Sequence, residues 1–422
     1  MSELSPAPGA LPQTSRPDGA AERPVGLVRG TRDWLPADCA RLAALERQLL
    51  DEFVRAGYQP IRTPILEFTE LHERKSGAGI VSKLFEVAGG DPTGICLRPE
   101  LTVSIVRAFA EAAVCPPLPW RVCMSGPVFR HEPEPGAEQL KLREFTQVGV
   151  ELIGAGGPAA DAEVIGLAHR SLVQAGIADV TIRIGHVGLI VEILGETGLP
   201  QGASSAMAEM LSAAAADGGR IEALESALDR WSDWLKPSGE AEEIVPAVRQ
   251  ADDRGVDRLF RQLVPDVTGR RSGHEIIHRL RRKWDLGHSL EEILGRVRDQ
   301  VHALGALRGP AREVLERLDR SLAAMAPRSV ADLHELIRGL ARQGVEPDRI
   351  ELDLGFGRGI GFYSQMIFEL VVTTGNGPIE VCGGGRYDGL AQVLGSDRDP
   401  RGVGFAFGLE RLAEACAPCP SR

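Results

Sequence analysis

Two strand-like runs on either side of a polar stretch constrain the fold of this chain most strongly. The runs span residues 122–129 and 147–153, and the stretch between them, 131–141, is polar and contains proline and glycine. Apolar runs that flank such a stretch predict a long antiparallel hairpin with an exposed tip. The chain is therefore expected to be built around an antiparallel β-sheet.

One face of this hairpin carries polar and aromatic groups that suit a ligand. Four side chains of the second strand share one parity and so point to the same side, namely Arg143, Phe145, Gln147 and Glu151. Arg130 ends the first strand, and its guanidinium can project over the same face. Planar forked donors suit phosphate oxygens, and an aromatic ring can stack on a purine. The alternative is an exposed hairpin with scattered charges, and the shared parity argues against it.

Helices are predicted around these strands. Apolar residues on one helical face predict a helix over 36–56, with Asp38 as its N-cap and Gly57 at its end. A second helix is predicted over 159–175, and the last helix begins near Gly404. Apolar runs bounded by turn residues predict further strands at 180–185, 349–354, 361–372 and 379–382.

The domain organisation follows from a change in character near residue 198. Between 198 and 328, Leu, Ala, Glu and Arg dominate at helical spacing. The prediction is an α+β core of residues 25–197 and 329–415, an antiparallel sheet flanked by helices, with an all-helical insertion at 198–328. Residues 1–24 are rich in Pro, Ala, Ser and Gly and are predicted to be a disordered tail.

Composition and charge narrow the class of protein. The net charge of −11 and the pI near 5.5 oppose non-specific attraction to nucleic acid or to an anionic membrane. No apolar run is long enough to span a bilayer, and the N-terminus lacks the apolar stretch of a signal peptide. We therefore expect a cytoplasmic protein that does not associate with membranes.

Two other features each have a simple interpretation that we prefer. Cys416 and Cys419 form a CxxC pair, but no second pair accompanies them, so we predict no metal site. The basic run 270–283 could contact RNA or an acidic partner. A solvated helix face explains the same run, and we favour that interpretation.

Two glycine-rich stretches complete the set of motifs. In the first, Arg358 lies between glycines, where a backbone can pass close to a ligand. A solvent-facing turn arginine would have the same pattern. In the second, the glycines at 383–385 and the stretch 402–412 lead from strand ends into a helix that carries Arg411. Its spacing matches neither the phosphate-binding P-loop nor the dinucleotide-binding fingerprint.

Together, these stretches resemble the signature motifs of class II aminoacyl-tRNA synthetases, specifically of the histidyl branch. The matching segments are 29–33, 57–58 and 63–64 for motif 1, 129–151 for motif 2, and 404–412 for motif 3. Residues 358–363 look like the histidine-specific arginine loop, and Leu-Arg-Pro-Glu at 97–100 looks like another histidyl element. The resemblance spans residues 26–195 and 330–415, in the family's order.

The resemblance implies a role for each matching residue. A bound histidine would be surrounded by Glu100, Gln147, Glu151, Arg358 and Tyr363. An adenine nucleotide would be held by Arg130, Arg143, Phe145 and Arg411. The chemistry is consistent, because an ammonium group prefers carboxylates and an imidazole needs a matched donor and acceptor.

Several positions depart from the synthetase pattern. Gly361 and Phe362 stand where the family has Asp and Tyr, and Leu101 replaces a glycine after the Leu-Arg-Pro-Glu element. In motif 2, Pro133–Pro135 replaces Arg-Pro-Gln, and this acidic, proline-rich loop is a poor match for a tRNA acceptor stem. Gly185–Gly188 instead resembles an element of the regulatory subunit of ATP phosphoribosyltransferase.

The leading hypothesis is a non-catalytic subunit that senses histidine. Only residues 413–422 follow motif 3, so we expect no C-terminal anticodon-binding domain and no tRNA partner. The resemblance then implies a hetero-oligomer with a short-form ATP phosphoribosyltransferase catalytic subunit, in the first step of histidine biosynthesis. Free histidine would be the effector, and no cofactor would be needed.

Two alternatives remain open at this point. A histidine-activating ligase, either a truncated histidyl-tRNA synthetase or a paralogue, would use Arg130, Arg358 and Arg411 to stabilise charge at the α-phosphate and would need Mg²⁺ and ATP. A scaffold with an empty pocket is the third possibility. Class II folds usually dimerise through motif 1, so a homodimer interface is expected near Pro64.

Overall fold

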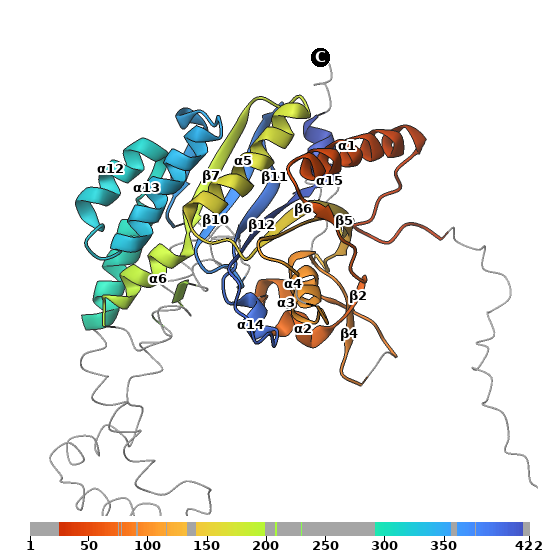
Figure 1. Ribbon diagram of the computed structural model, residues 1–422, viewed down its shortest axis with the longest axis horizontal. Coiled ribbons are helices and arrows are strands. Elements are labelled where there is room, and N and C mark those ends of the chain that lie inside the picture. Colours follow the sequence, from red (N-terminus) through yellow and green to blue (C-terminus); the bar gives the residue numbers. More distant parts are fainter. Residues whose placement is uncertain are drawn as a thin grey trace, which may run out of the picture.

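The computed structural model describes residues 25–198 except 75, 77, 90, 91, 115 and 133–140. It also describes residues 207, 208 and 229, and residues 292–416 except 356–360 and 376. Two sheets are present in these residues (Figure 1). The main sheet has nine strands in the order β1-β5-β6-β12-β11-β10-β7-β9-β8, and the small sheet has the order β2-β4-β3.

The strands of the main sheet come from both halves of the chain. In chain order they are β1 (Gln59–Pro60), β5 (Trp120–Phe129), β6 (Glu144–Ile153), β7 (Val180–His186), β8 (Arg308–Pro310), β9 (Ile350–Asp353), β10 (Met366–Thr374), β11 (Gly377–Arg386) and β12 (Gly402–Gly408). The small sheet contains β2 (Leu66–Phe68), β3 (Phe85–Glu86) and β4 (Ile95–Leu97).

The predicted hairpin is confirmed. Strands β5 and β6 pair antiparallel from Trp120 opposite Ile153 to Phe129 opposite Glu144. Most strand pairs of the main sheet are antiparallel, as predicted, but β1 pairs with β5 and β7 pairs with β9 in parallel. Parallel neighbours need a long crossover connection, and the chain between β7 and β9 supplies one. The sheet is therefore mixed, within an α+β fold.

One face of the sheet is covered by helices that bury the larger apolar core. These helices are α1 (Pro36–Arg55), α5 (Pro158–Gln174), α6 (Val187–Gly195), α12 (Ala311–Ser321), α13 (Pro327–Arg342) and α15 (Leu409–Ala415) (Figure 1). Alternate residues of β6, Val148, Val150 and Leu152, point into this core. The odd residues of β6, including Glu151, therefore face the other side.

The other face is covered only in part. Helix α4 (Thr102–Ala110) and α14 (Leu390–Val393) pack there around Val122, Met124, Phe362 and Tyr387. The short helices α2 (Thr69–Glu73) and α3 (Ala78–Val81) lie near the small sheet (Figure 1). We call this the front face, and it carries most of the residues predicted to form a site.

Some predicted boundaries are wrong. Helix α1 has Leu35, not Asp38, at its N-cap, because Pro36 starts the helix and no side chain caps it. Gly57, with φ of 91°, does end it. The last helix does not begin near Gly404, since β12 occupies 402–408 and α15 starts at Leu409.

Two further boundaries differ because long-range pairing decides them. Strand β10 starts at Met366 rather than at 361, since Ser364 N bonds to the carbonyl of Arg386 outside the ladder. The insertion predicted as all-helical up to 328 contains β8, which pairs with β9 of the main sheet. A three-residue strand has no periodicity that the sequence could reveal.

Other predictions fall on residues outside the described part of the chain. These are the tail 1–24, the insertion between 199 and 291 apart from three positions, the basic run 270–283, Pro133–Pro135, Arg358 and Cys419. Across the residues that are described, no helix is both long and apolar enough to cross a membrane. The same residues contain no group of three His, Cys, Asp or Glu side chains placed to hold a metal ion.

Candidate functional site

Glycines on the front face make room for the site side chains. A Cβ atom at Gly404 of β12 would lie 2.5 Å from both Cδ of Glu151 and the carbonyl oxygen of Val150. A Cβ at Gly385 of β11 would lie 2.8 Å from the ring of Tyr363. Because these positions have no side chain, Glu151 and Tyr363 lie directly against the strand backbone.

A buried cluster of hydrogen bonds holds Glu151 on this face. Thr102 Oγ1 donates to Glu151 Oε1 at 2.7 Å, and the hydroxyl of Tyr387 donates to Oε2. These three residues come from α4, from β6 and from the residue after β11. Glu151 is only 3% exposed, so its carboxyl group depends on these partners instead of water.

Glu100 lies beside this cluster and caps α4. Its carboxyl oxygens accept hydrogen bonds from the backbone N–H groups of Thr102 at 2.6 Å and Val103 at 3.0 Å. Gln147 Oε1 accepts from Leu101 N at 3.2 Å, so the same turn also meets β6. The structure thus brings three predicted histidine-site residues, Glu100, Gln147 and Glu151, to the start of α4.

Both carboxyl groups are shifted toward their neutral forms. Burial raises the pKa of Glu151 to about 8, against the opposing effect of the Tyr387 and Thr102 hydrogen bonds, and nearby Glu100 raises it further. Burial also raises the pKa of Glu100, although the backbone donors at Val103 and Thr102 oppose this. A cationic ligand would favour ionisation of both groups, so the cluster suits an ammonium group.

An aromatic wall stands next to the carboxyl cluster. The ring of Phe362 lies 4.8 Å from that of Tyr363 and 6.3 Å from that of Tyr387, both in edge-to-face geometry. Phe362 stands where the resemblance to the synthetases leads us to expect a tyrosine. Its ring is buried, so this side chain serves packing. Tyr363, predicted for the histidine site, therefore connects to Glu151 through Phe362 and Tyr387.

The residues predicted for a nucleotide are only partly gathered. Arg130 places its guanidinium carbon 5.3 Å from the ring centre of Phe145, and its Nε donates to the carbonyl of Pro99 at 2.9 Å. Arg411 lies on α15 close to Gly408. Arg143 instead directs its guanidinium to the carbonyl of Glu132, at 3.1 and 3.3 Å, where it joins the two sides of the hairpin.

Three residues of this site were not predicted from the sequence. Thr102 and Tyr387 both bond to Glu151, and both lie beside motifs that the sequence did reveal. His72 is fully buried, with Nδ1 3.9 Å from Glu100 Oε1, and neither ring nitrogen has a hydrogen-bond partner in the described part of the chain. Burial lowers its pKa to about 4, so it is neutral near pH 7. No local sequence pattern predicts His72 as a site residue, because only the packing of α2 places its ring beside Glu100.

Comparison with solved structures identifies the fold of this chain. An ATP phosphoribosyltransferase regulatory subunit/histidyl-tRNA synthetase from Bacillus halodurans has a similar structure, with a TM-score of 0.63 and 23% identity over 93% of this chain and 83% of that one. The apo histidyl-tRNA synthetase of S. aureus matches with a TM-score of 0.51 and 20% identity, over 93% of this chain and 70% of that one. These likenesses show the class II synthetase-like fold.

Sequence comparison identifies the family of this chain. The histidine–tRNA ligase of Pyrococcus horikoshii is 30% identical over 392 residues, which cover 92% of this chain and 74% of that protein. The ATP phosphoribosyltransferase regulatory subunit of Moorella thermoacetica is 32% identical over 394 residues, which cover 93% of this chain and 82% of that protein. The histidyl-tRNA synthetase family profile matches residues 30–251 and 240–412. With the front-face cluster and motif order in agreement, the chain belongs to the histidyl-tRNA synthetase family.

Proposed function

We propose that this chain is a non-catalytic, histidine-sensing regulatory subunit of ATP phosphoribosyltransferase. Relatives at about 30% identity carry that name, including the proteins of Moorella thermoacetica and Syntrophotalea carbinolica. Other relatives of similar identity are named histidine–tRNA ligases. The choice between the two activities therefore rests on the residues of this chain.

The front-face cluster supports histidine as the ligand. Free histidine presents an ammonium group, which would pair with the carboxyl groups of Glu100 and Glu151. Its imidazole needs one donor and one acceptor, and Glu151, Gln147 and the tyrosine hydroxyls supply both kinds. Arg358 is proposed to face the histidine carboxylate.

The amino-acid composition of the motif 2 tip favours a regulatory subunit over a tRNA ligase. Between residues 131 and 141 the chain has three glutamates and one lysine. Nucleic-acid backbones are held mainly by Lys and Arg, and an acidic loop repels them. The net charge of −11 acts in the same direction.

The second candidate is a histidine-activating ligase. The contact of Arg130 with the ring of Phe145, with Arg411 in the first turn of α15, favours it, because these groups could hold an adenine nucleotide. Only this candidate needs ATP and Mg²⁺. It would transfer activated histidine to an acceptor other than the end of a tRNA, or to a tRNA held by a different surface.

Two measurements on the purified chain separate the candidates. Calorimetric titration with histidine should show binding, and histidine-dependent ATP–pyrophosphate exchange should be absent. The Glu151→Gln variant should bind histidine at least about tenfold more weakly, because a charged hydrogen bond is worth about 1.5–3 kcal/mol. The matched control is Glu144→Gln, an exposed residue of the same strand, which should bind normally. Robust exchange would establish the ligase instead.

The partner is tested by reconstitution. Mixed with a short-form ATP phosphoribosyltransferase catalytic subunit, the chain should co-elute in size-exclusion chromatography and raise phosphoribosyltransferase activity. Histidine should inhibit the mixture made with the natural chain and not the mixture made with Glu151→Gln. Equal inhibition of both mixtures would place the histidine sensor elsewhere.

A further inference from the structure

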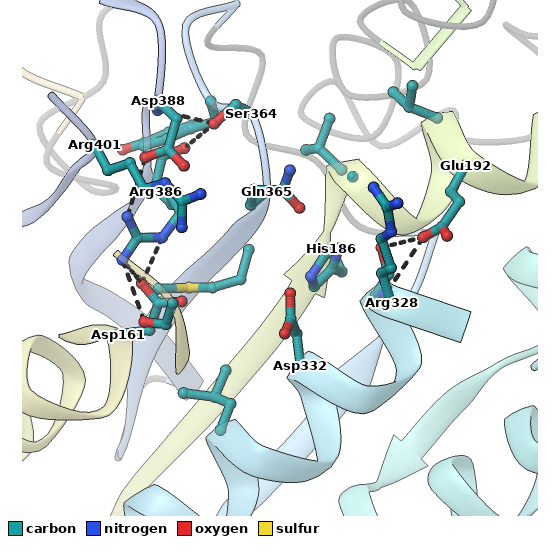
Figure 2. A pocket seen from close by; sticks show the side chains of 18 of the residues that line it. Asp161, His186, Glu192, Arg328, Asp332, Ser364, Gln365, Arg386, Asp388 and Arg401 are labelled. Carbon is teal, nitrogen blue, oxygen red and sulfur yellow. Dashed lines mark hydrogen bonds and ion pairs between the residues drawn. The ribbon is translucent and has the colours of Figure 1, made fainter. Parts of the chain in front are cut away.

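A cavity of about 630 Å³ lies where the C-terminal end of β7 meets the N-terminal end of β10 (Figure 2). The first turns of α5, α6 and α13 also line it, through Asp161, Gly188 and Ser329. Ligand sites typically have volumes of roughly 300–1,000 Å³, so a small metabolite fits.

This cavity is adjacent to the predicted histidine site and shares Tyr363 with it. Phe362 packs in the front-face cluster with Tyr387, whereas Met366 packs in the larger core on the other face. Both residues line the cavity, so the segment 361–366 runs between the two places. Glu100, Gln147 and Glu151 do not line it.

Most charges of the cavity are already compensated. Arg386 pairs with Asp161, its Nε donating at 2.9 Å, and with Asp388 at 3.0 Å. Glu192 accepts hydrogen bonds from Ser329 N at 3.2 Å and Oγ at 2.8 Å, and so offsets the positive end of α13.

Two arginines of the lining, Arg401 and Arg328, make no side-chain hydrogen bond or close ion pair with the residues that the structure describes. The charge of Arg401 acts at longer range on the carboxyl group of Asp332, across the cavity. Figure 2 shows Arg401 beside Arg386 and Asp388, and Arg328 beside Glu192, with His186 and Asp332 between them. An unpaired guanidinium in a concave site is suited to an anionic group.

The absence of a side chain at Gly156 makes room for the side chain of Arg401. A Cβ at Gly156 would lie 2.8 Å from Nη1 of Arg401, so the side chain lies across this glycine just before α5. Helix α5 has 17 residues and no side-chain cap at Gly157. Arg401 and the uncapped helix end are both positive, and an anion between them would relieve their repulsion.

A buried donor faces the same cavity. His186 is 2% exposed, and its Nδ1 accepts from Leu189 N at 2.8 Å, which leaves the proton on Nε2. Nε2 has no partner among the residues described, and the ring lines the cavity (Figure 2). Gln365 and Asp332 provide a further amide and a carboxylate acceptor.

We propose that this cavity is a second ligand site that takes a small anion carried by a hydroxylated body, such as a sugar phosphate or a sugar acid. Arg401 and the N-terminus of α5 hold the phosphate or carboxylate, and Arg328 adds positive charge from the opposite wall. Asp332, Gln365 and His186 bond to the hydroxyl groups. The lining has four acids against three arginines, which disfavours a bare polyanion.

The test uses four commercial probes on the full chain without histidine. Saturation-transfer difference NMR should show binding of D-ribose 5-phosphate or D-gluconate and none of D-ribose. Stronger binding of the phosphate or of the carboxylate identifies which anion the site takes. Absence of both, or stronger binding of putrescine, would overturn the proposal.

Variants localise the binding. Arg401→Gln should weaken the bound probe about tenfold, since one charge-assisted contact is lost, and Arg328→Gln should weaken it in the same direction. Gly156→Ala keeps every charge but displaces Arg401, and it should also weaken binding. Arg342→Gln, which changes the last residue of α13, is the matched control and should bind normally.

Thermal unfolding confirms that each variant folds, and unchanged binding in Arg401→Gln and Gly156→Ala would disprove the site. None of these results depends on the proposed regulatory function.

Discussion

At the scale of single residues, Glu151 shows how position changes chemistry. The same carboxyl group in water has a pKa near 4.5, whereas burial raises it to about 8 here. The folded chain therefore keeps a proton that the unfolded chain releases between these pH values. Because the folded state binds more protons, this residue contributes a loss of stability as pH rises from about 4.5 to 8.

This reasoning predicts the pH dependence of unfolding for Glu151→Gln. The variant has no carboxyl group to ionise, so its stability should fall less between pH 5 and pH 9. At pH 9 the free energy of unfolding of the variant should exceed that of the natural chain by roughly 2–4 kcal/mol. This figure allows for the hydrogen bonds that the variant loses. Urea unfolding at several pH values measures it. Glu144→Gln serves as the exposed control, and parallel curves for the natural chain and Glu151→Gln would contradict the protonated state.

Glycines of β12 provide a second residue-scale prediction. Gly404→Ala places a Cβ against Glu151 and the backbone of Val150, and backbone cannot move away cheaply. We expect a loss of about 1–3 kcal/mol, as for other overpacked sites, together with loss of histidine binding. Gly408→Ala, on the same face of the same strand, meets nothing closer than 3.8 Å and should change neither. Thermal unfolding and calorimetry check both variants.

At the scale of elements, one buried ion pair joins α5 to the end of β11. Arg386 is 2% exposed and Asp161 is 5% exposed, and the two are linked by Nε and Nη2. Burial raises the pKa of Asp161 to about 6, although Arg386 opposes this. Removing one partner would leave the other buried and unpaired, which is the costly case.

We therefore predict that Arg386→Met destabilises the chain by about 3–5 kcal/mol. The exposed pair Arg349–Asp179 is the comparison, and Arg349→Met should cost about 1 kcal/mol or less. Denaturant unfolding of the two variants at pH 7 measures both values. Similar costs for the two substitutions would show that burial does not govern the strength of the Arg386 network.

At the scale of the whole molecule, the small sheet exposes an apolar surface. Leu66 and Phe68 lie on the same side of β2 and are 53% and 54% exposed, and Ile65 and Val87 are nearby in this sheet region and 40% and 39% exposed. Contiguous exposed apolar side chains mark association surfaces. This region follows the motif 1 segment, so a second copy of the chain is its expected partner.

The corresponding prediction concerns the oligomeric state. The natural chain should be a dimer by size-exclusion chromatography with light scattering. Leu66→Asp with Phe68→Glu should give a folded monomer, because two charges would be buried in the interface. Val173→Glu, which changes an exposed apolar residue of α5, should remain dimeric. A dimer that survives the double substitution would place the interface elsewhere.

The hairpin, helices α1 and α5, the parity of the motif 2 residues and the family resemblance could all be predicted from the sequence. These are properties of spacing along the chain, and the chain's local periodicity is sufficient to reveal them. It missed β8, the start of β10 and the strand at Gly404, where short or glycine-rich segments have no pattern of their own.

The groups that meet in space depend on tertiary packing, so they could not be predicted from the sequence. Thr102 of α4 and Tyr387 after β11 both bond to Glu151 of β6, and Arg143 bonds to the carbonyl of Glu132. The strand-end cavity likewise gathers Arg328, Arg401 and His186 from distant segments. Burial sets the pKa of Glu151, and burial depends on contacts between residues far apart in the chain.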